Sequence, residues 1–271
     1  MVVGSIAAVA LSLTPGRLDA ADARVSYTPK PIPAETAKPI PDRIGIADVM
    51  PRLEDEDRPF NVVVLGDSTG VSENGWHVNL AVWMGETYDR PAIIHPWDGR
   101  PSVDAYQDTT WGMTQGVNAP IDMWNASVGS TKSDHPMTRL DRMIPVDGQD
   151  VDLIFVNYGH NHTTGNILTE GSALVKTLVE RYPDAAVVLM LQNPERAGSP
   201  HASMQMAINS YWQRYAEGQG FDHIDVWSAF KAEPDLDALL DPVGDLHPNK
   251  AGYKLWSDTV IDALTSSNGA S

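Results

Sequence analysis

The chain has 271 residues, 42% of them hydrophobic, which suffices to bury one large core. Its 36 acidic and 19 basic residues give a net charge of −17, which opposes binding to the phosphates of a nucleic acid. The absence of cysteine excludes disulfides, thiolate catalysis and cysteine-ligated metals.

The N-terminal apolar stretch, residues 6–13, is much shorter than the roughly 20 residues that a membrane span requires. We therefore expect no membrane span there. The stretch has the character of a secretory signal's apolar region, although no basic residue precedes it and Arg17 is the first in the chain. The alternatives are a small strand and a remnant of a longer chain. The signal interpretation predicts an extracellular protein, secreted or attached to the surface of a cell or virion.

Prolines crowd the segment between residues 27 and 51, where they remove backbone donors and fix φ. They are Pro29, Pro31, Pro33, Pro39, Pro41 and Pro51. Such a composition favours extended polyproline geometry and predicts a tether. We therefore expect residues 1–60 to form an N-terminal arm with a Pro-rich tether, and residues 61–271 to form one folded domain.

Short apolar runs bounded by polar residues or glycine predict buried parallel strands. They cover residues 61–65, 121–124, 153–156, 186–191 and 224–226. Apolar residues at helical spacing predict helices over residues 76–88, 171–181, 204–216 and 250–264. This alternation predicts an α/β fold whose parallel sheet is covered on both faces, with ligands at the carboxyl ends of the strands.

Two further segments bear on the site. Asn249 directly precedes the last predicted helix, where its side-chain oxygen can accept an N–H of the first turn. Residues 90–120 are the least regular part and contain Trp97, Tyr106 and Trp111. We expect this part to form an insertion over the site, with its aromatic residues either lining a cleft or belonging to the core.

A serine stands where the first predicted strand ends, in the sequence Gly66-Asp67-Ser68-Thr69-Gly70. The glycines permit a tight turn, and the carboxyl edge of a parallel sheet is a suitable place for a nucleophile. Serine needs an adjacent base, usually histidine, to take its proton. The alternative is an ordinary polar turn, because turns are rich in these residue types.

Three further loops carry residues that can complete such a site. His247 precedes the last predicted helix, and its distance from Ser68 in sequence is no objection because triad residues meet in space. Gly129 follows the second predicted strand and Asn161 the third. With the N–H of Ser68, a glycine N–H and an asparagine amide can form an oxyanion hole. Each of these residues alone is better explained as part of an ordinary loop, so the prediction depends on their conjunction.

In their order and places, these four blocks resemble the SGNH (GDSL-type) hydrolase family. The matching residues are Ser68, Gly129, Asn161 and His247, and the resemblance covers residues 61–264. It implies a flavodoxin-like three-layer α/β/α fold with a parallel central sheet, the SGNH hydrolase fold. It also implies a carboxylic ester hydrolase that forms an acyl-serine without a cofactor. In that family Ser68 and His247 would be catalytic, while Ser68, Gly129 and Asn161 would form the oxyanion hole.

The acid of the expected triad departs from the family pattern. The family usually places it three residues before the histidine, where this chain has Gly244. Asp245 and Asp241 are the available carboxylates, and we expect Asp245 to be the catalytic acid because it lies in the same loop as His247. The acid holds the imidazole in the right tautomer, which another acceptor can partly do, so a Ser-His dyad is the alternative.

The third block also departs, because Asn161 is followed by His162 where the family commonly has an acid. His160 and His162 would point to opposite sides of an extended segment, and His135 could join them only if the chain folds back. Since catalytic zinc normally has three protein ligands, we expect no metal site and place both imidazoles at the substrate cleft or against neighbouring loops. We expect Asp67 to organise the nucleophile loop and not to act in catalysis.

On the strength of this resemblance we expect a serine esterase that removes short-chain acyl groups, acetyl above all, from cell-surface polysaccharide. No amphipathic stretch suited to a lipid interface argues for a lipase. One alternative is a weakly catalytic or non-catalytic glycan-binding module of a surface or phage tail structure, and another is an acyltransferase. The expected partner is the ester substrate, with no nucleic acid, and the oligomeric state is left open.

Overall fold

The computed structural model describes residues 43–146, 150–244 and 246–267. Within them an eight-stranded sheet has the order β3-β2-β5-β1-β6-β7-β8, with β4 paired to β2. The strands are β1 (Phe60–Gly66), β2 (Ala92–Asp98), β3 (Ala105–Tyr106), β4 (Trp111–Gly112), β5 (Ile121–Asn125), β6 (Val151–Asn157), β7 (Ala186–Leu191) and β8 (His223–Asp225). All neighbouring pairs in the order β2-β5-β1-β6-β7-β8 are parallel, whereas β3 and β4 run antiparallel to β2. The predicted parallel sheet is confirmed and carries an antiparallel edge.

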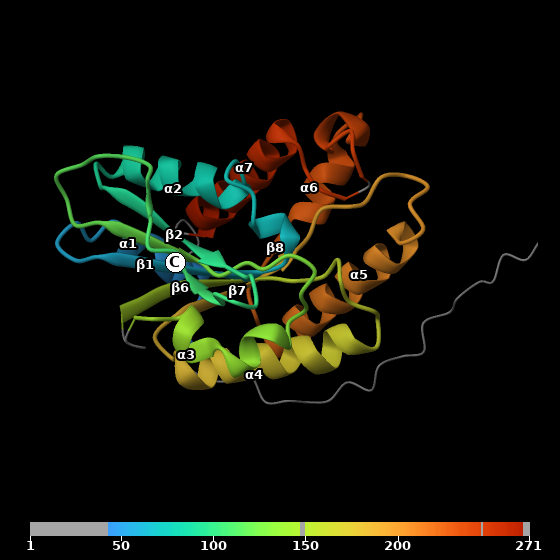
Figure 1. Cartoon of the computed structure of the whole chain (residues 1–271), viewed down its shortest axis with the longest axis horizontal. Coiled ribbons are helices and arrows are strands. Elements are labelled where there is room, and N and C mark those ends of the chain that lie inside the picture. The colour runs from blue at the N-terminus through green and yellow to red at the C-terminus, as the bar shows by residue number, and fades with distance from the viewer. Residues whose placement is uncertain (1–42, 147–149, 245, 268–271) are drawn as a thin grey trace, which may run out of the picture. The chain divides into compact units, whose positions relative to one another are not determined.

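Helices cover both faces of the sheet, which confirms the three-layer α/β/α fold (Figure 1). One face carries α2 (Trp76–Thr87), α6 (Val226–Ala232) and α7 (Lys250–Ser267), and the other carries α3 (Leu140–Met143), α4 (Ser172–Arg181) and α5 (Ala202–Gln219). Shorter helical turns are η1 (Ile46–Asp48), η2 (Ser68–Gly70), η3 (His135–Thr138), η5 (Ile167–Gly171) and η6 (Leu236–Leu239). Among the residues described, no helix is both long enough and apolar enough to cross a bilayer.

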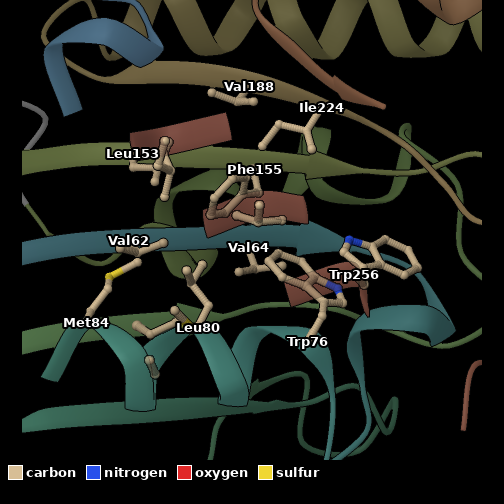
Figure 2. Close-up of a cluster of buried hydrophobic side chains, with 14 of the residues drawn as sticks. Val62, Val64, Trp76, Leu80, Met84, Leu153, Phe155, Val188, Ile224 and Trp256 are labelled. Atoms are coloured by element: carbon tan, nitrogen blue, oxygen red, sulfur yellow. The ribbon is translucent and has the colours of Figure 1, made fainter. Parts of the chain in front are cut away.

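Alternation along the central strand divides the core between the two faces. Val62 and Val64 of β1 point to the face covered by α2 and α7, where Trp76 and Trp256 stack with ring centroids 5.9 Å apart (Figure 2). Leu65 points to the other face. Because both faces are buried, β1 is buried along its whole length, and it holds the loop that follows it at the middle of the sheet.

The last predicted strand ends earlier than the sequence suggested. The apolar run predicts an extended chain over residues 224–226, but β8 ends at Asp225 and Val226 begins α6. The reason is a helix cap, since the Oδ1 of Asp225 accepts the N–H of Ser228 at 2.9 Å. The other predicted strands and helices are present with small shifts at their ends.

Residues 90–120 do not form the expected insertion. They supply β2, β3 and β4, and β2 lies inside the sheet beside β5. His95 and Pro96 interrupt the apolar run of β2, which explains why the sequence did not predict this strand. Trp97 is buried against Tyr106 with ring centroids 4.9 Å apart, so it belongs to the core and not to a cleft wall.

The folded domain begins before residue 61. The expected boundary between residues 60 and 61 is therefore wrong, because the segment just before it belongs to the core. The short helix α1 (Val49–Leu53) packs in the core, with Val49 and Leu53 fully buried. Pro51 is compatible with this helix because it lies in the first turn, where a missing N–H costs no helical hydrogen bond. Residues 1–42 of the expected arm lie outside the described residues, and their tether character stays a prediction.

Candidate active site

The loop after β1 carries Ser68 and is organised by Asp67. The chain turns there into η2, and the buried Asp67 carboxylate caps this turn. Its Oδ1 accepts the N–H of Thr69 at 3.0 Å and the hydroxyl of Thr69 at 2.9 Å. Asp67 therefore organises the loop as predicted, and Ser68 is held at the carboxyl edge of the sheet.

His247 reaches the same edge from the far end of the chain. Its Nε2 lies 2.9 Å from the Oγ of Ser68, although the two residues are 179 positions apart in sequence. The loop that carries His247 is closed by the N–H of Asp241, which donates to the carbonyl of His247 at 2.8 Å. Asn249 then caps α7 as predicted, since its Oδ1 accepts the N–H of Ala251 at 2.9 Å. Loop and helix together fix the imidazole beside the serine.

The electrostatic surroundings keep His247 neutral. Burial lowers the pKa of His247, and the neighbouring His160 lowers it further. The carboxylates of Asp67 and Asp241 oppose part of this shift, because a negative charge stabilises the imidazolium. The net lowering leaves Nε2 unprotonated near pH 7, so it can accept the hydroxyl proton of Ser68.

The acid partner of His247 stays a prediction, because Asp245 lies outside the described residues. The alternative carboxylate, Asp241, uses its Oδ1 to accept the N–H of Val243 at 2.8 Å. Its charge also raises the pKa of His247. Asp241 therefore stabilises the charged imidazole from within the same loop, whereas a triad acid would in addition bond Nδ1 and set the tautomer.

Gly129 and Asn161 lie on two loops that are joined at this edge. A methyl group on Gly129 would lie 3.8 Å from the Cβ of Ser68, so the glycine stands directly beside the serine. The exposed Asn161 donates from Nδ2 to the carbonyl of Thr131 at 2.9 Å. This bond ties the Asn161 loop to the Gly129 loop and uses one of the two N–H groups of the amide. The part of both residues in an oxyanion hole stays a prediction.

The two imidazoles of the third block face different surroundings. The buried His162 accepts through Nε2 the N–H of Ser133 at 3.2 Å, with the Ser133 hydroxyl 2.9 Å away. His160 instead places Nε2 3.3 Å from the Oδ1 of Asn193 and Nδ1 3.6 Å from the Oε1 of Glu195. Both rings contact neighbouring loops, one of the two places expected for them. Across the described part of the chain, no three potential ligand side chains gather around a common point for a metal.

A set of buried carboxamides lies beneath these loops, and no pattern in the sequence assigned them a role. Asn125 ends β5, Asn157 ends β6, and Gln192 and Asn193 directly follow β7. Asn125 donates to the carbonyl of Gly70 at 2.8 Å, and Asn157 donates to the hydroxyl of Thr69 at 3.1 Å. The sequence does contain a signal for them, because an asparagine or glutamine stands at or directly after the end of each of these apolar strands.

Two buried histidines near the site are held neutral. Burial lowers the pKa of His77 to about 3, and its Nε2 accepts a hydrogen bond from the Nδ2 of Asn125 at 2.9 Å. Burial likewise lowers the pKa of His162 to about 4, against the opposing charge of Glu170. Both side chains therefore stay uncharged in the folded state near neutral pH.

We expect the free energy of unfolding to fall as the pH drops from about 6.5 toward 4, because unfolded histidine titrates near pH 6.5. In this window the unfolded chain binds up to two more protons through His77 and His162, and each contributes about 1.4 kcal/mol per pH unit. Above the window both states are neutral and this dependence vanishes. Urea unfolding at about pH 5, 6 and 7 measures it. His162→Gln should reduce the slope by one proton, and an unchanged slope would contradict the assignment.

Comparison with known proteins places the chain in a family. Residues 64–255 match the GDSL-like lipase/acylhydrolase family, while no curated protein matched. A two-domain esterase active on acetylated mannans, co-crystallised with mannopentaose, has 17% identity and a TM-score of 0.57, with 82% of this chain and 52% of that chain covered. This chain therefore spans about half the length of that esterase.

Two further solved structures match over most of their own length. A lipase/acylhydrolase from Enterococcus faecalis has 15% identity and a TM-score of 0.54, covering 78% of this chain and 96% of that one. A variant of an acetyl xylan esterase from Geobacillus stearothermophilus has 15% identity and a TM-score of 0.52, covering 76% and 94%. At such low identities the structural similarity shows only that the fold is shared. This shared fold agrees with the family match, which covers most of the chain. The chain therefore belongs to the GDSL-like lipase/acylhydrolase family, as its resemblance to SGNH hydrolases predicted.

Proposed function

We propose that this protein is a serine esterase that hydrolyses short-chain acyl esters, acetyl esters above all, through an acyl-serine intermediate. One observation carries the proposal: the Nε2 of His247 lies 2.9 Å from the Oγ of Ser68. That is the distance at which a general base takes the proton of a nucleophile. Membership in a family of lipases and acylhydrolases supports the same class of reaction.

In the proposed acylation, His247 takes the hydroxyl proton of Ser68 while Oγ attacks the carbonyl carbon of the ester. The carbonyl oxygen becomes an oxyanion, held by the backbone N–H groups of Ser68 and Gly129 and by the side-chain amide of Asn161. The imidazolium then gives its proton to the leaving alcohol, which departs and leaves an acyl-serine. Asp245 holds the imidazole in the required tautomer.

In the proposed deacylation, His247 takes a proton from a water molecule, whose oxygen attacks the acyl carbon of the acyl-serine. The same donors hold the second oxyanion. Collapse of this intermediate breaks the bond to Oγ, and the imidazolium returns its proton to Ser68. Side chains and backbone supply every group in this cycle, so the proposed reaction needs neither a metal nor an organic cofactor.

We propose acetylated polysaccharide as the substrate class. The names of two similar structures mention activity on acetylated mannans and an acetyl xylan esterase, and both align with this chain at low identity. Ser68 and His247 are half-buried at the sheet edge, so an ester carried on a large sugar chain can reach them from solvent. Such a substrate fits the extracellular or surface location that the N-terminal apolar stretch suggests.

A fluorophosphonate probe tests the nucleophile directly, because it reacts with an activated serine hydroxyl and becomes covalently bound. We expect one label, on the peptide that contains Ser68. A glycan-binding module whose serine is not activated would not be labelled. Absence of the label on Ser68 would therefore refute the esterase mechanism.

Product analysis tests the substrate class. We expect faster acetate release from acetylated xylan or mannan than acid release from fatty-acyl esters, measured at equal ester concentration. Preference for the fatty-acyl esters would contradict the proposed substrate. Transfer of the acetyl group to added sugar in preference to water would identify an acyltransferase instead.

A further inference from the structure

The buried Gln192 contacts the nucleophile loop. It directly follows β7 and is fully buried. Its Nε2 donates to the Oδ2 of Asp67 at 3.0 Å and lies 3.1 Å from the hydroxyl oxygen of Thr69. These two residues flank Ser68, so the amide of Gln192 supports the nucleophile from below the loop without exposure to solvent.

The other end of the same amide supports the loop of Asn161. The Oε1 of Gln192 accepts the N–H of His160 at 2.8 Å. A Cβ on Gly159 would come within 2.6 Å of that Oε1, so any side chain larger than a hydrogen at Gly159 would displace the amide. One carboxamide thus connects Asp67 to His160, which are the residues directly before Ser68 and Asn161.

A carboxamide is the side chain that suits both ends of this link. The carboxylate of Asp67 needs a donor, while the N–H of His160 needs an acceptor, and an amide offers both. A glutamate in place of Gln192 would keep the acceptor but, while ionised, would set a carboxylate oxygen against Asp67. A methionine of similar size would lose both bonds.

We infer that Gln192 is a positioning residue of the oxyanion hole, which sets the distance between Ser68 and the Asn161 amide in the transition state. The inference rests on the proposed esterase function. The developing oxyanion needs the amide of Asn161 in place while Ser68 bonds to the same carbon, and a displacement of about 1 Å can cost roughly 100-fold in rate. Because Gln192 is buried beneath the loops, its loss acts on kcat more than on KM.

The test compares Gln192→Met and Gln192→Glu with the wild-type protein. We expect kcat for p-nitrophenyl acetate to fall roughly 10- to 100-fold in both variants, with KM within about threefold of wild type. Asn61→Ala is the matched control, since it removes a buried carboxamide at the opposite end of β1, where Nδ2 donates to the carbonyl of Asp150 at 3.0 Å. This control should lower the melting temperature and keep kcat. If Gln192→Met does not fold, Gln192→Glu, which keeps the acceptor for His160, carries the test.

A double-mutant cycle separates positioning from general stability. In an Asn161→Ala background, Gln192→Glu should lower kcat less than about threefold, because no amide remains to be misplaced. An equal loss in both backgrounds would overturn the inference, as would full kcat in the Gln192 variants. Ser68→Ala on the same ester keeps the two hypotheses apart. If Ser68→Ala still hydrolyses the ester, the esterase mechanism itself is wrong. If Ser68→Ala is inactive but the Gln192 variants are fully active, only the inference about Gln192 is wrong.

Discussion

Replacement of Ser68 by alanine should abolish ester hydrolysis and leave the fold intact. The Oγ of Ser68 is the atom that would bond to the acyl carbon, and the base beside it, His247, cannot replace it in that role. We expect kcat for p-nitrophenyl acetate to fall by roughly 10⁴-fold or more. Initial rates at saturating ester measure this loss. Thermal unfolding should change little, because Ser68 is half-buried and the carboxylate of Asp67 still caps the turn.

The matched control for this prediction is Ser72→Ala in the same loop. The Oγ of Ser72 accepts the N–H of Asn74 at 3.2 Å, so the Ser72 hydroxyl stabilises the local turn. Ser72→Ala should keep its turnover and its fluorophosphonate label. If Ser68→Ala instead hydrolyses the ester at the wild-type rate, another group supplies the nucleophile, and the proposed acyl-serine mechanism is wrong.

The pairing of Ser68 with His247 could be predicted because local signals place each residue. The strand β1 is apolar and buried on both faces, so its end and the following serine could be located from the sequence. Asn249 marks the start of α7 and therefore places the loop of His247 just before it. A parallel sheet then gathers these loops at one edge.

The strand β2 and the helix α1 could not be predicted in the same way. In β2, His95 and Pro96 interrupt the apolar run, and tertiary pairing with β5 decides the conformation. In α1, Pro51 joined a proline-rich composition that favours an extended chain. Burial of Val49 and Leu53 in the core overrides that local preference.

The carboxamide links were hidden for a different reason. Gln192 and Asp67 are 125 positions apart, and the partner of a side-chain amide is chosen in space, so sequence spacing carries no information about it. A polar residue that closes an apolar strand is equally compatible with exposure to solvent and with burial under a loop. The sequence locates such a residue at the carboxyl edge of the sheet, and only the folded arrangement of the loops shows what it bonds.

Replacement of Asn161 by alanine should slow the chemical step without weakening substrate binding. The amide of Asn161 is the side-chain donor of the proposed oxyanion hole, and the interaction strengthens as negative charge develops on the carbonyl oxygen. Loss of one such donor typically lowers kcat by roughly 10²- to 10³-fold, with a small change in KM. Steady-state kinetics with p-nitrophenyl acetate give both constants, and Asn166→Ala is the control. Asn166 lies in the same loop, and its Oδ1 accepts the N–H of Thr163 at 2.6 Å.

Asn161→Asp distinguishes a donor to the oxyanion from a strut between two loops. Aspartate has the size of asparagine but no N–H group, and its charge would repel the oxyanion, so kcat should fall at least as far as in Asn161→Ala. If the amide served only to hold the carbonyl of Thr131, both variants would instead lower the melting temperature and leave kcat close to wild type. That result would show that Asn161 is not part of the oxyanion hole. The backbone N–H groups of Ser68 and Gly129 would then stabilise the oxyanion without it.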